Sequence, residues 1–221
     1  MNRNPSPSRS GPEPERKRAR RGSARTLILD AAVQLIREKG FAATSVDDLC
    51  KAAGVTKGAF FHNFESKEAL GVALAEYWGE MTAPMFAAAP YHQPADPLDR
   101  VLAYVDFRKE LVQGGIPDFS CVAGTLSQET YGEYPAIREA CGNTIFGHAA
   151  TLEPDFAEAI EEYGVTGTTA PSLARHTQAV LQGAFIMAKA GGEREAVLDA
   201  LSHLRRYLEL LFGREPSHGH A

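Results

Sequence analysis

The sequence predicts an all-α protein in which a small three-helix domain precedes a larger helical domain. Apolar residues recur at helical spacing through most of the 221 residues, and no stretch alternates as a convincing strand would. The apolar content of 44% is typical of globular chains. We expect residues 1–22 to form a disordered basic arm, 23–67 the small domain, 68–213 the larger domain and 214–221 a flexible tail.

Positive charge is concentrated at the start of the chain. Residues 1–25 hold eight Lys or Arg against two Glu, whereas residues 68–221 hold ten against 21 Asp or Glu. Residues 1–22 are rich in Pro, Ser and Arg and contain too few apolar side chains to order themselves. This arm either follows the phosphates or minor groove of a nucleic acid or is only a solubilising tail.

The small domain is predicted to begin with a support helix near Leu27, which Gly40 ends. Phe41 should then plug the base of the domain. The apolar face of this helix consists of Ile28, Ala31, Ala32, Leu35 and Ile36.

A second helix is predicted to start near Val46, because apolar residues follow it at helical spacing. Thr44 or Ser45 can cap its N-terminus, since an acidic residue lies three positions after each of them. Gly54 can end this helix in the left-handed conformation.

After a tight turn, Thr56 can cap a third helix that contains a glycine and extends to about His62. Propensity alone would not hold so short a helix, so Phe60 and Phe64 must pack it against its neighbour. A helix presented in this way can enter the DNA major groove, where its leading residues meet base edges and nearby basic groups meet phosphates.

The run AATSVDDLCKAAGVTKGAFFHNFESKEAL, residues 42–70, resembles the helix-turn-helix of the tetracycline-repressor (TetR/AcrR) family of bacterial transcription regulators. The resemblance covers roughly residues 27–74, and the turn, the lysine–glycine pair, the aromatic cluster and the Ser-Lys-Glu triplet all match in register. It implies that double-stranded DNA is a partner of this chain.

By position, the resemblance implies phosphate contacts from Thr44 and Lys67. The family usually has two tyrosines where this chain has Phe61 and His62. Phe61 cannot donate the hydroxyl hydrogen bond, whereas His62 can donate through its ring N–H. The predicted DNA-binding residues are Thr44, Ser45, Thr56, Lys57, Gly58, Ala59, Phe61, His62, Asn63 and Lys67, of which Lys57, Gly58 and Ala59 approach base edges.

Ser66 can cap a long helix that runs from Lys67 towards Met81 and is weakened at Pro84. In the family this helix links the two domains, so movement of its far end can swing the DNA-reading end. Beyond Pro90 the spacing predicts further helices over residues 96–113, 119–131, 135–152 and 156–163, a break at Pro154, and a loop over 164–170.

Two helices, Pro171 to Ala190 and Glu193 to Phe212, are predicted to close the chain. Family members dimerise through their last two helices, so the resemblance implies a homodimer that reads an inverted repeat with half-sites about one turn or a little more apart. A purely internal core would explain the same apolar stripes. The predicted interface residues are Val180, Gly183, Ala184, Met187, Val197, Leu201, Leu204, Leu208 and Leu211.

The larger domain is expected to hold a small-molecule effector of unknown identity in an apolar pocket. Its helices supply aromatic and polar side chains for such a pocket, although core packing would explain each of them as well. We expect no metal and no cofactor, because no second ligand lies at helical spacing from either candidate histidine. The candidate pocket residues are Trp78, Tyr104, Phe107, Phe119, Cys121, Phe146, His148 and His176.

Three cysteines without a CxxC pair argue against a disulfide framework and a zinc site. The segment around Cys121 resembles a branch of the family in which some relatives sense oxidants through cysteine. A reactive thiol needs a lowered pKa, and Asp118 would oppose that shift, so we expect an unreactive Cys121. A cysteine-based redox-sensing repressor is the alternative.

No catalytic or nucleotide-binding motif is present, and we do not expect an enzyme. The longest uncharged run, Met81 to Ala95, is broken by prolines, so we expect a cytoplasmic protein without a membrane partner. The predicted function is that of a dimeric one-component transcriptional repressor, released from its operator by a small molecule. The alternative is a helical ligand-binding or scaffold protein whose DNA binding has degenerated.

Overall fold

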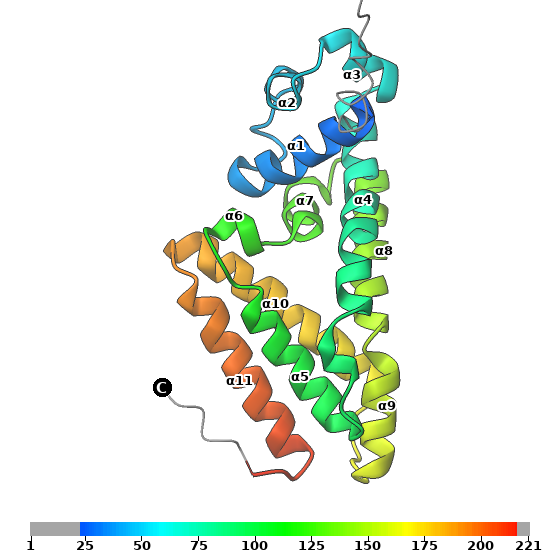
Figure 1. Ribbon diagram of the computed structural model, residues 1–221, viewed down its shortest axis with the longest axis vertical. Helices are drawn as coiled ribbons and strands as arrows, with labels where there is room; N and C mark the ends of the chain where they lie inside the picture. Colours follow the sequence, from blue (N-terminus) through cyan, green and yellow to red (C-terminus); the bar gives the residue numbers. More distant parts are fainter. Residues whose placement is uncertain (1–22, 216–221) are drawn as a thin grey trace, which may run out of the picture.

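A computed structural model describes residues 23–215, which form helices and no strand (Figure 1). The predicted basic arm and the last six residues of the predicted tail lie outside this part. No helix within it is long and apolar enough to cross a lipid bilayer. The elements in chain order are α1 (Ala24–Lys39), α2 (Val46–Ala53), α3 (Lys57–Asn63), α4 (Lys67–Ala87), the 3₁₀ turn η2 (Pro90–His92), α5 (Pro97–Glu110), α6 (Ile116–Phe119), α7 (Val122–Thr130), α8 (Pro135–Ala150), α9 (Glu153–Glu162), α10 (Ala170–Gly191) and α11 (Glu195–Leu211).

The helix ends of the N-terminal lobe follow the sequence closely. Ser45, rather than Thr44, caps α2: its hydroxyl accepts a hydrogen bond from the backbone N–H of Asp48, whose carboxylate accepts one from the backbone N–H of Ser45. Gly54 ends α2 with φ of 65° and ψ of 34°, the left-handed conformation that glycine adopts without steric cost. The hydroxyl of Thr56 caps α3 in the same way, through the backbone N–H of Ala59.

Proline and serine positions account for three differences from the predicted helices. Helix α4 continues through Pro84 to Ala87, three residues beyond the expected weakening. The predicted helix over 119–131 is instead two helices, because Ser120 is extended and separates α6 from α7. Pro154 lies in the first turn of α9, where a missing N–H removes no helical hydrogen bond, so the chain breaks just before it.

One hydrophobic core joins the N-terminal helices to the larger lobe. It begins among α1, α2 and α3 with buried residues such as Leu49 and Phe60, passes along α4, and continues into α7 and α8. Gly71 of α4 permits the close approach of α8, since a Cβ at this position would lie 2.6 Å from Cδ1 of Ile137. The three N-terminal helices are therefore packed on the larger lobe and do not form a separate core.

The second core lies among α5, α9, α10 and α11. The leucine stripe of α11 faces this core, where Leu201 and Leu208 are fully buried against the same chain. The prediction that this stripe forms a dimer interface is therefore wrong for Val197, Leu201, Leu204 and Leu208, which are covered by their own subunit.

A polar group of three residues lies beside this core. The hydroxyl of buried Tyr104 shares a 2.9 Å hydrogen bond with Nε2 of His148 and accepts one of 3.1 Å from Nε2 of Gln178. Burial, reinforced by the nearby charge of Arg108, lowers the pKa of His148 to about 4. His148 is therefore neutral at physiological pH.

This depressed pKa predicts a pH dependence of stability. Between pH 6.5 and pH 4 the unfolded chain binds a proton at His148 that the folded chain does not, so this contribution is complete above pH 6.5 and is lost as the pH falls towards 4. Relative to His148→Gln, the wild-type chain should lose up to about 3 kcal/mol of unfolding free energy across this range. Urea denaturation at several pH values measures the difference.

The matched control is His62→Gln, which removes an exposed histidine from α3. This variant should follow the wild-type pH dependence. Equal pH dependence in wild type and His148→Gln would contradict the proposed titration.

Candidate nucleic-acid interface and ligand cavity

Helix α3 lies at the outer end of the molecule, next to α2 and on top of α1 (Figure 1). Phe60 and Phe64 are buried and fix α3 on this support, as the spacing predicts. The opposite face presents Lys57, Gly58 and Phe61, and the Phe61 side chain is 51% exposed. A Cβ at Gly58 would meet no atom closer than 3.8 Å, so this part of the helix is open to close approach by another molecule.

The cation at the start of α3 is held by a surface ion pair. Nζ of Lys57 lies 2.9 Å from Oδ1 of Asp47 on α2, and both side chains are exposed. The carboxylate raises the pKa of Lys57, which is therefore charged at neutral pH. An exposed pair of this kind contributes little to stability, so Lys57 can exchange Asp47 for a base edge or a phosphate at small cost.

Lys67 and Thr44 lie below α3 in different environments. Half-buried Lys67 donates to the carbonyl oxygen of Ala42 at 3.4 Å and lies 4.4 Å above the ring of Phe41. Burial lowers its pKa. Thr44 is fully buried, and its hydroxyl donates to the carbonyl oxygen of Gly40 at 2.6 Å. The structure therefore leaves Thr44 no exposed group for the phosphate contact that the family resemblance implies.

Several other predicted DNA-binding side chains already make hydrogen bonds within the N-terminal lobe. The hydroxyls of Ser45 and Thr56 cap helices, and the Asn63 amide donates to the carbonyl oxygen of Ala59 at 2.8 Å. His62 is exposed, and Ala59 is half-buried. A further cation on this surface is Arg25, whose guanidinium lies 4.7 Å from the ring of Phe64. Arg25 is not among the residues predicted from the sequence, although a basic residue at the start of the support helix was the available signal.

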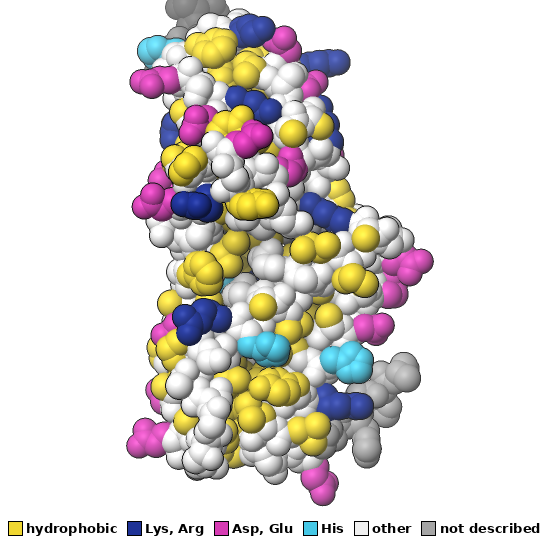
Figure 2. All heavy atoms as spheres, turned by 180° about the vertical axis from the view of Figure 1, so that it is seen from behind, with side chains coloured by type: hydrophobic (Ala, Val, Ile, Leu, Met, Phe, Trp, Pro, Cys, Tyr) yellow, Lys and Arg dark blue, Asp and Glu magenta, His cyan; other side chains and the backbone are white. Residues whose placement is uncertain are grey.

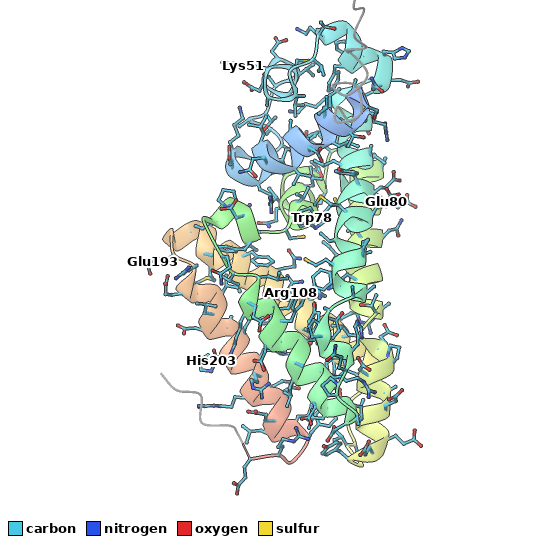
Figure 3. All side chains as sticks on the ribbon, in the orientation of Figure 1. Lys51, Trp78, Glu80, Arg108, Glu193 and His203 are labelled. Carbon is cyan, nitrogen blue, oxygen red and sulfur yellow. The ribbon has the colours of Figure 1, made fainter. Side chains whose placement is uncertain are left out.

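A cavity of about 880 Å³ lies in the larger lobe between α4, α5, α8 and α10. Of the predicted pocket residues, Trp78, Phe119, Cys121 and His148 line it. Figure 3 shows Trp78 of α4 and Arg108 of α5 pointing towards the interior, whereas Glu80 and His203 point outwards. Lining residues that the sequence analysis missed include Arg37, Phe86, Arg108, Gln178, Gln182 and Phe185.

Four predicted pocket residues do not line the cavity. Tyr104 is buried behind it and contacts its lining through hydrogen bonds with His148, Gln178 and Arg108. Phe107 packs on Phe86 with ring centroids 5.8 Å apart. The other two lie on outer surfaces: Phe146 is 61% exposed on α8, and the ring of His176 on α10 lies 5.3 Å from that of Tyr207.

Arg37 reaches the cavity from α1, the support helix of the N-terminal lobe. Its Nη1 donates to the carbonyl oxygens of Asp118 at 3.1 Å and Ser120 at 3.5 Å, and its guanidinium lies 5.2 Å from the ring of Trp78. Burial lowers the pKa of this guanidinium, although an arginine stays charged. A residue of the N-terminal lobe is thus part of the cavity wall.

Cys121 caps α7 through its sulfur, which accepts a hydrogen bond from the backbone N–H of Gly124 at 3.4 Å. Arg37 and Lys189 lie close enough to interact electrostatically with this thiol, so Asp118 is not its only charged neighbour. Cys141 is buried, and burial raises its pKa to about 11. Within residues 23–215, no three His, Cys, Asp or Glu side chains are placed to hold a metal ion.

The outer faces of α10 and α11 expose an apolar surface. Figure 2 shows hydrophobic side chains on the back of the larger lobe. Of the predicted interface residues, Gly183 and Met187 are exposed, Val180 and Leu211 are half-buried, and Ala184 is buried. Three further exposed apolar residues of these two helices were not predicted from the sequence: Ile186, Tyr207 and Leu210.

Two family models match the chain. The first, described as bacterial regulatory proteins of the tetR family, covers residues 28–74, and the second, a transcriptional regulator LmrA/YxaF-like C-terminal domain, covers residues 97–203. The HTH-type transcriptional repressor NemR of Escherichia coli K12 is 29% identical over 195 residues, which are 83% of this chain and 93% of NemR.

Solved structures share the fold. The reduced form of E. coli NemR superposes with a TM-score of 0.69 at 27% identity, over 82% of this chain and 95% of that one. A TetR-family regulator from Agrobacterium tumefaciens superposes with a TM-score of 0.73 at 22% identity, over 86% and 97% of the two chains. With a tetR-type N-terminal domain followed by a regulator C-terminal domain, this chain belongs to the TetR family of bacterial transcriptional regulators.

Proposed function

We propose that this regulator is a homodimeric repressor that binds an inverted-repeat operator and leaves it when a small molecule occupies the cavity of the larger lobe. The observation that carries this proposal is the cavity wall itself. Arg37 belongs to the support helix of the DNA-binding lobe, yet it lines the cavity and bonds to the α6 end. A ligand in contact with this wall acts directly on the helix that carries α3.

The DNA-reading surface in this proposal is the exposed face of α3 with the cations around it. Lys57, Gly58 and Ala59 approach base edges, while Lys67, His62 and Arg25 meet phosphates. Thr44 is left out because it is buried. The exposed cation Lys57 and the open Gly58 at the N-terminal end of α3 favour DNA binding over the alternative of a scaffold whose DNA binding has degenerated.

Dimerisation in this proposal uses the exposed faces of α10 and α11. Met187 and Leu210, 63% and 60% exposed, belong to neighbouring helices on this face. A second copy related by a two-fold axis would cover both side chains and orient the two α3 helices towards one side of a duplex. The redox-sensing alternative is not favoured over release by a ligand.

The first test is selection of bound sequences from a random duplex library. We expect a two-fold symmetric motif whose half-site centres are about 34–36 Å apart, or a little more. The selection is repeated at two salt concentrations, because contacts to phosphate alone weaken uniformly with salt. Recovery of no motif would overturn the repressor proposal in favour of the scaffold.

Two lysine variants separate base reading from phosphate binding. Lys57→Ala should weaken binding to the selected motif by roughly 5- to 150-fold and leave binding to random DNA nearly unchanged. Lys67→Ala should weaken binding to both and reduce the slope of log affinity against log salt by about 1. Fluorescence anisotropy titrations measure both effects.

The matched control is Arg194→Ala, which removes an exposed cation from the turn between α10 and α11 in the larger lobe, well away from α3 (Figure 1). It should leave both affinities close to those of the wild type. Equal losses on motif and random DNA for Lys57→Ala would show that α3 does not read the bases.

A charge placed in the proposed dimer face should separate the subunits. Met187→Glu would bury an unpaired carboxylate at the interface, which should raise the dimer dissociation constant on the order of 100-fold. Phe146→Glu on α8 is the matched control, because Phe146 is equally exposed and lies outside this face. Sedimentation velocity measures the dimer fraction, and an unchanged dimer in Met187→Glu and Leu210→Glu would reject this face.

A further inference from the structure

The charged groups of the cavity are unevenly satisfied. Its lining includes two cations, Arg37 and Arg108, and one carboxylate, Asp118. Asp118 accepts a 2.8 Å hydrogen bond from the backbone N–H of Gly115, and the guanidinium of Arg37 is bonded to carbonyl oxygens of the α6 end. Asp118 and Arg37 thus have hydrogen-bond partners on the backbone. Arg108 is the remaining charged group of the lining.

Arg108, in the last turn of α5, is held among aromatic rings without a counter-ion. Its guanidinium lies 5.2 Å from the ring centre of Phe86 and 6.0 Å from that of Tyr104. Within residues 23–215 the guanidinium makes one long hydrogen bond, 3.5 Å from Nη1 to the Tyr104 hydroxyl, and its Nε is buried without a partner. Among residues 23–215 no carboxylate oxygen lies within 4.0 Å of it.

The neighbours of Arg108 cannot supply the missing negative charge. Burial raises the pKa of Tyr91 to about 12, so this phenol stays protonated at neutral pH. His148 is neutral, as described above. An arginine cannot lose its proton in response, and a charge that is shielded from water and unpaired is unfavourable.

The remainder of the wall is suited to an apolar body. The wall is mainly apolar and includes aromatic and thioether side chains from α4, α6 and α10, and a volume of about 880 Å³ is within the range of small-molecule sites. Gln182 and Asn143 also line the cavity, and neither side-chain amide makes a hydrogen bond within residues 23–215. The lining therefore combines one unpaired cation, two free amides and a large apolar surface that includes Trp78, Met81, Met85, Phe119 and Phe185.

We propose that the effector is an organic anion, a carboxylate on an aromatic or aliphatic body, whose negative group pairs with Arg108. This inference rests on the proposed role of the cavity as the effector site and names the class of ligand. Folding has already removed much of the water from the guanidinium, so the anion meets a preorganised partner and its attraction is little screened. A neutral ligand of the same shape would leave the cation unpaired, and an amine would be repelled.

The test compares ligands that differ only in the charged group. Binding to the full chain is measured without DNA, by isothermal titration calorimetry and by thermal denaturation. The first set of ligands is 4-phenylbutyrate, 4-phenylbutanamide and 4-phenylbutylamine, and the second and third sets are the carboxylate, amide and amine forms of 2-naphthoate and decanoate. We expect at least one carboxylate to bind tenfold or more tightly than its amide and its amine. Arg108→Gln should remove this preference, whereas Arg138→Gln, which changes an exposed arginine outside the cavity, should keep it.

Three outcomes would overturn the proposal. They are amide or amine binding as tight as that of the carboxylate, retention of the carboxylate preference in Arg108→Gln, and no binding by any of the three carboxylates. The comparison of ligands on the wild-type chain stands even where Arg108→Gln does not fold. Because no DNA is present, failure of this test is distinct from failure of operator binding, which the library selection measures.

Discussion

The packing of α4 against α8 is the constraint on which the rest of this molecule depends. Gly71 lets the two helices approach so closely that a Cβ would overlap Ile137, and the core around this contact reaches from Phe60 in α3 to Cys141 in α8. A three-helix lobe as small as this one buries little surface by itself. Because it shares a core with the larger lobe, a shift of α4 or α7 changes the position of α3 directly.

The cavity lies beside this shared core and has a wall from each lobe. Arg37 connects α1 to the carbonyl oxygens at the end of α6, and Cys121 at the start of α7 follows immediately in the chain. A ligand that displaces this end of α6 therefore changes the support of α1. The coupling needs only a rigid-body shift, since the helices on both sides are tightly packed and cannot deform gradually.

The charged groups that line the cavity differ in whether the fold supplies them with partners. The fold gives Asp118 and Arg37 backbone partners, but places Arg108 over aromatic rings and keeps its neighbours His148 and Tyr91 neutral. Without a carboxylate partner, this arginine has only its aromatic contacts and one long hydrogen bond to offset its lost hydration. Its position is understandable as that of a binding group whose partner arrives with the ligand.

The sequence by itself determined the local features: the cap at Thr56, the left-handed Gly54, the all-helical class and the face of α3 that carries Phe60. These depend on residues within one or two turns of each other. Tertiary structure alone decided that the α11 leucines face inwards, that Thr44 is buried, and that Arg37 and Arg108 line the cavity while Phe146 does not. Helical periodicity reveals that a face is covered, but the neighbour that covers it comes from distant parts of the chain.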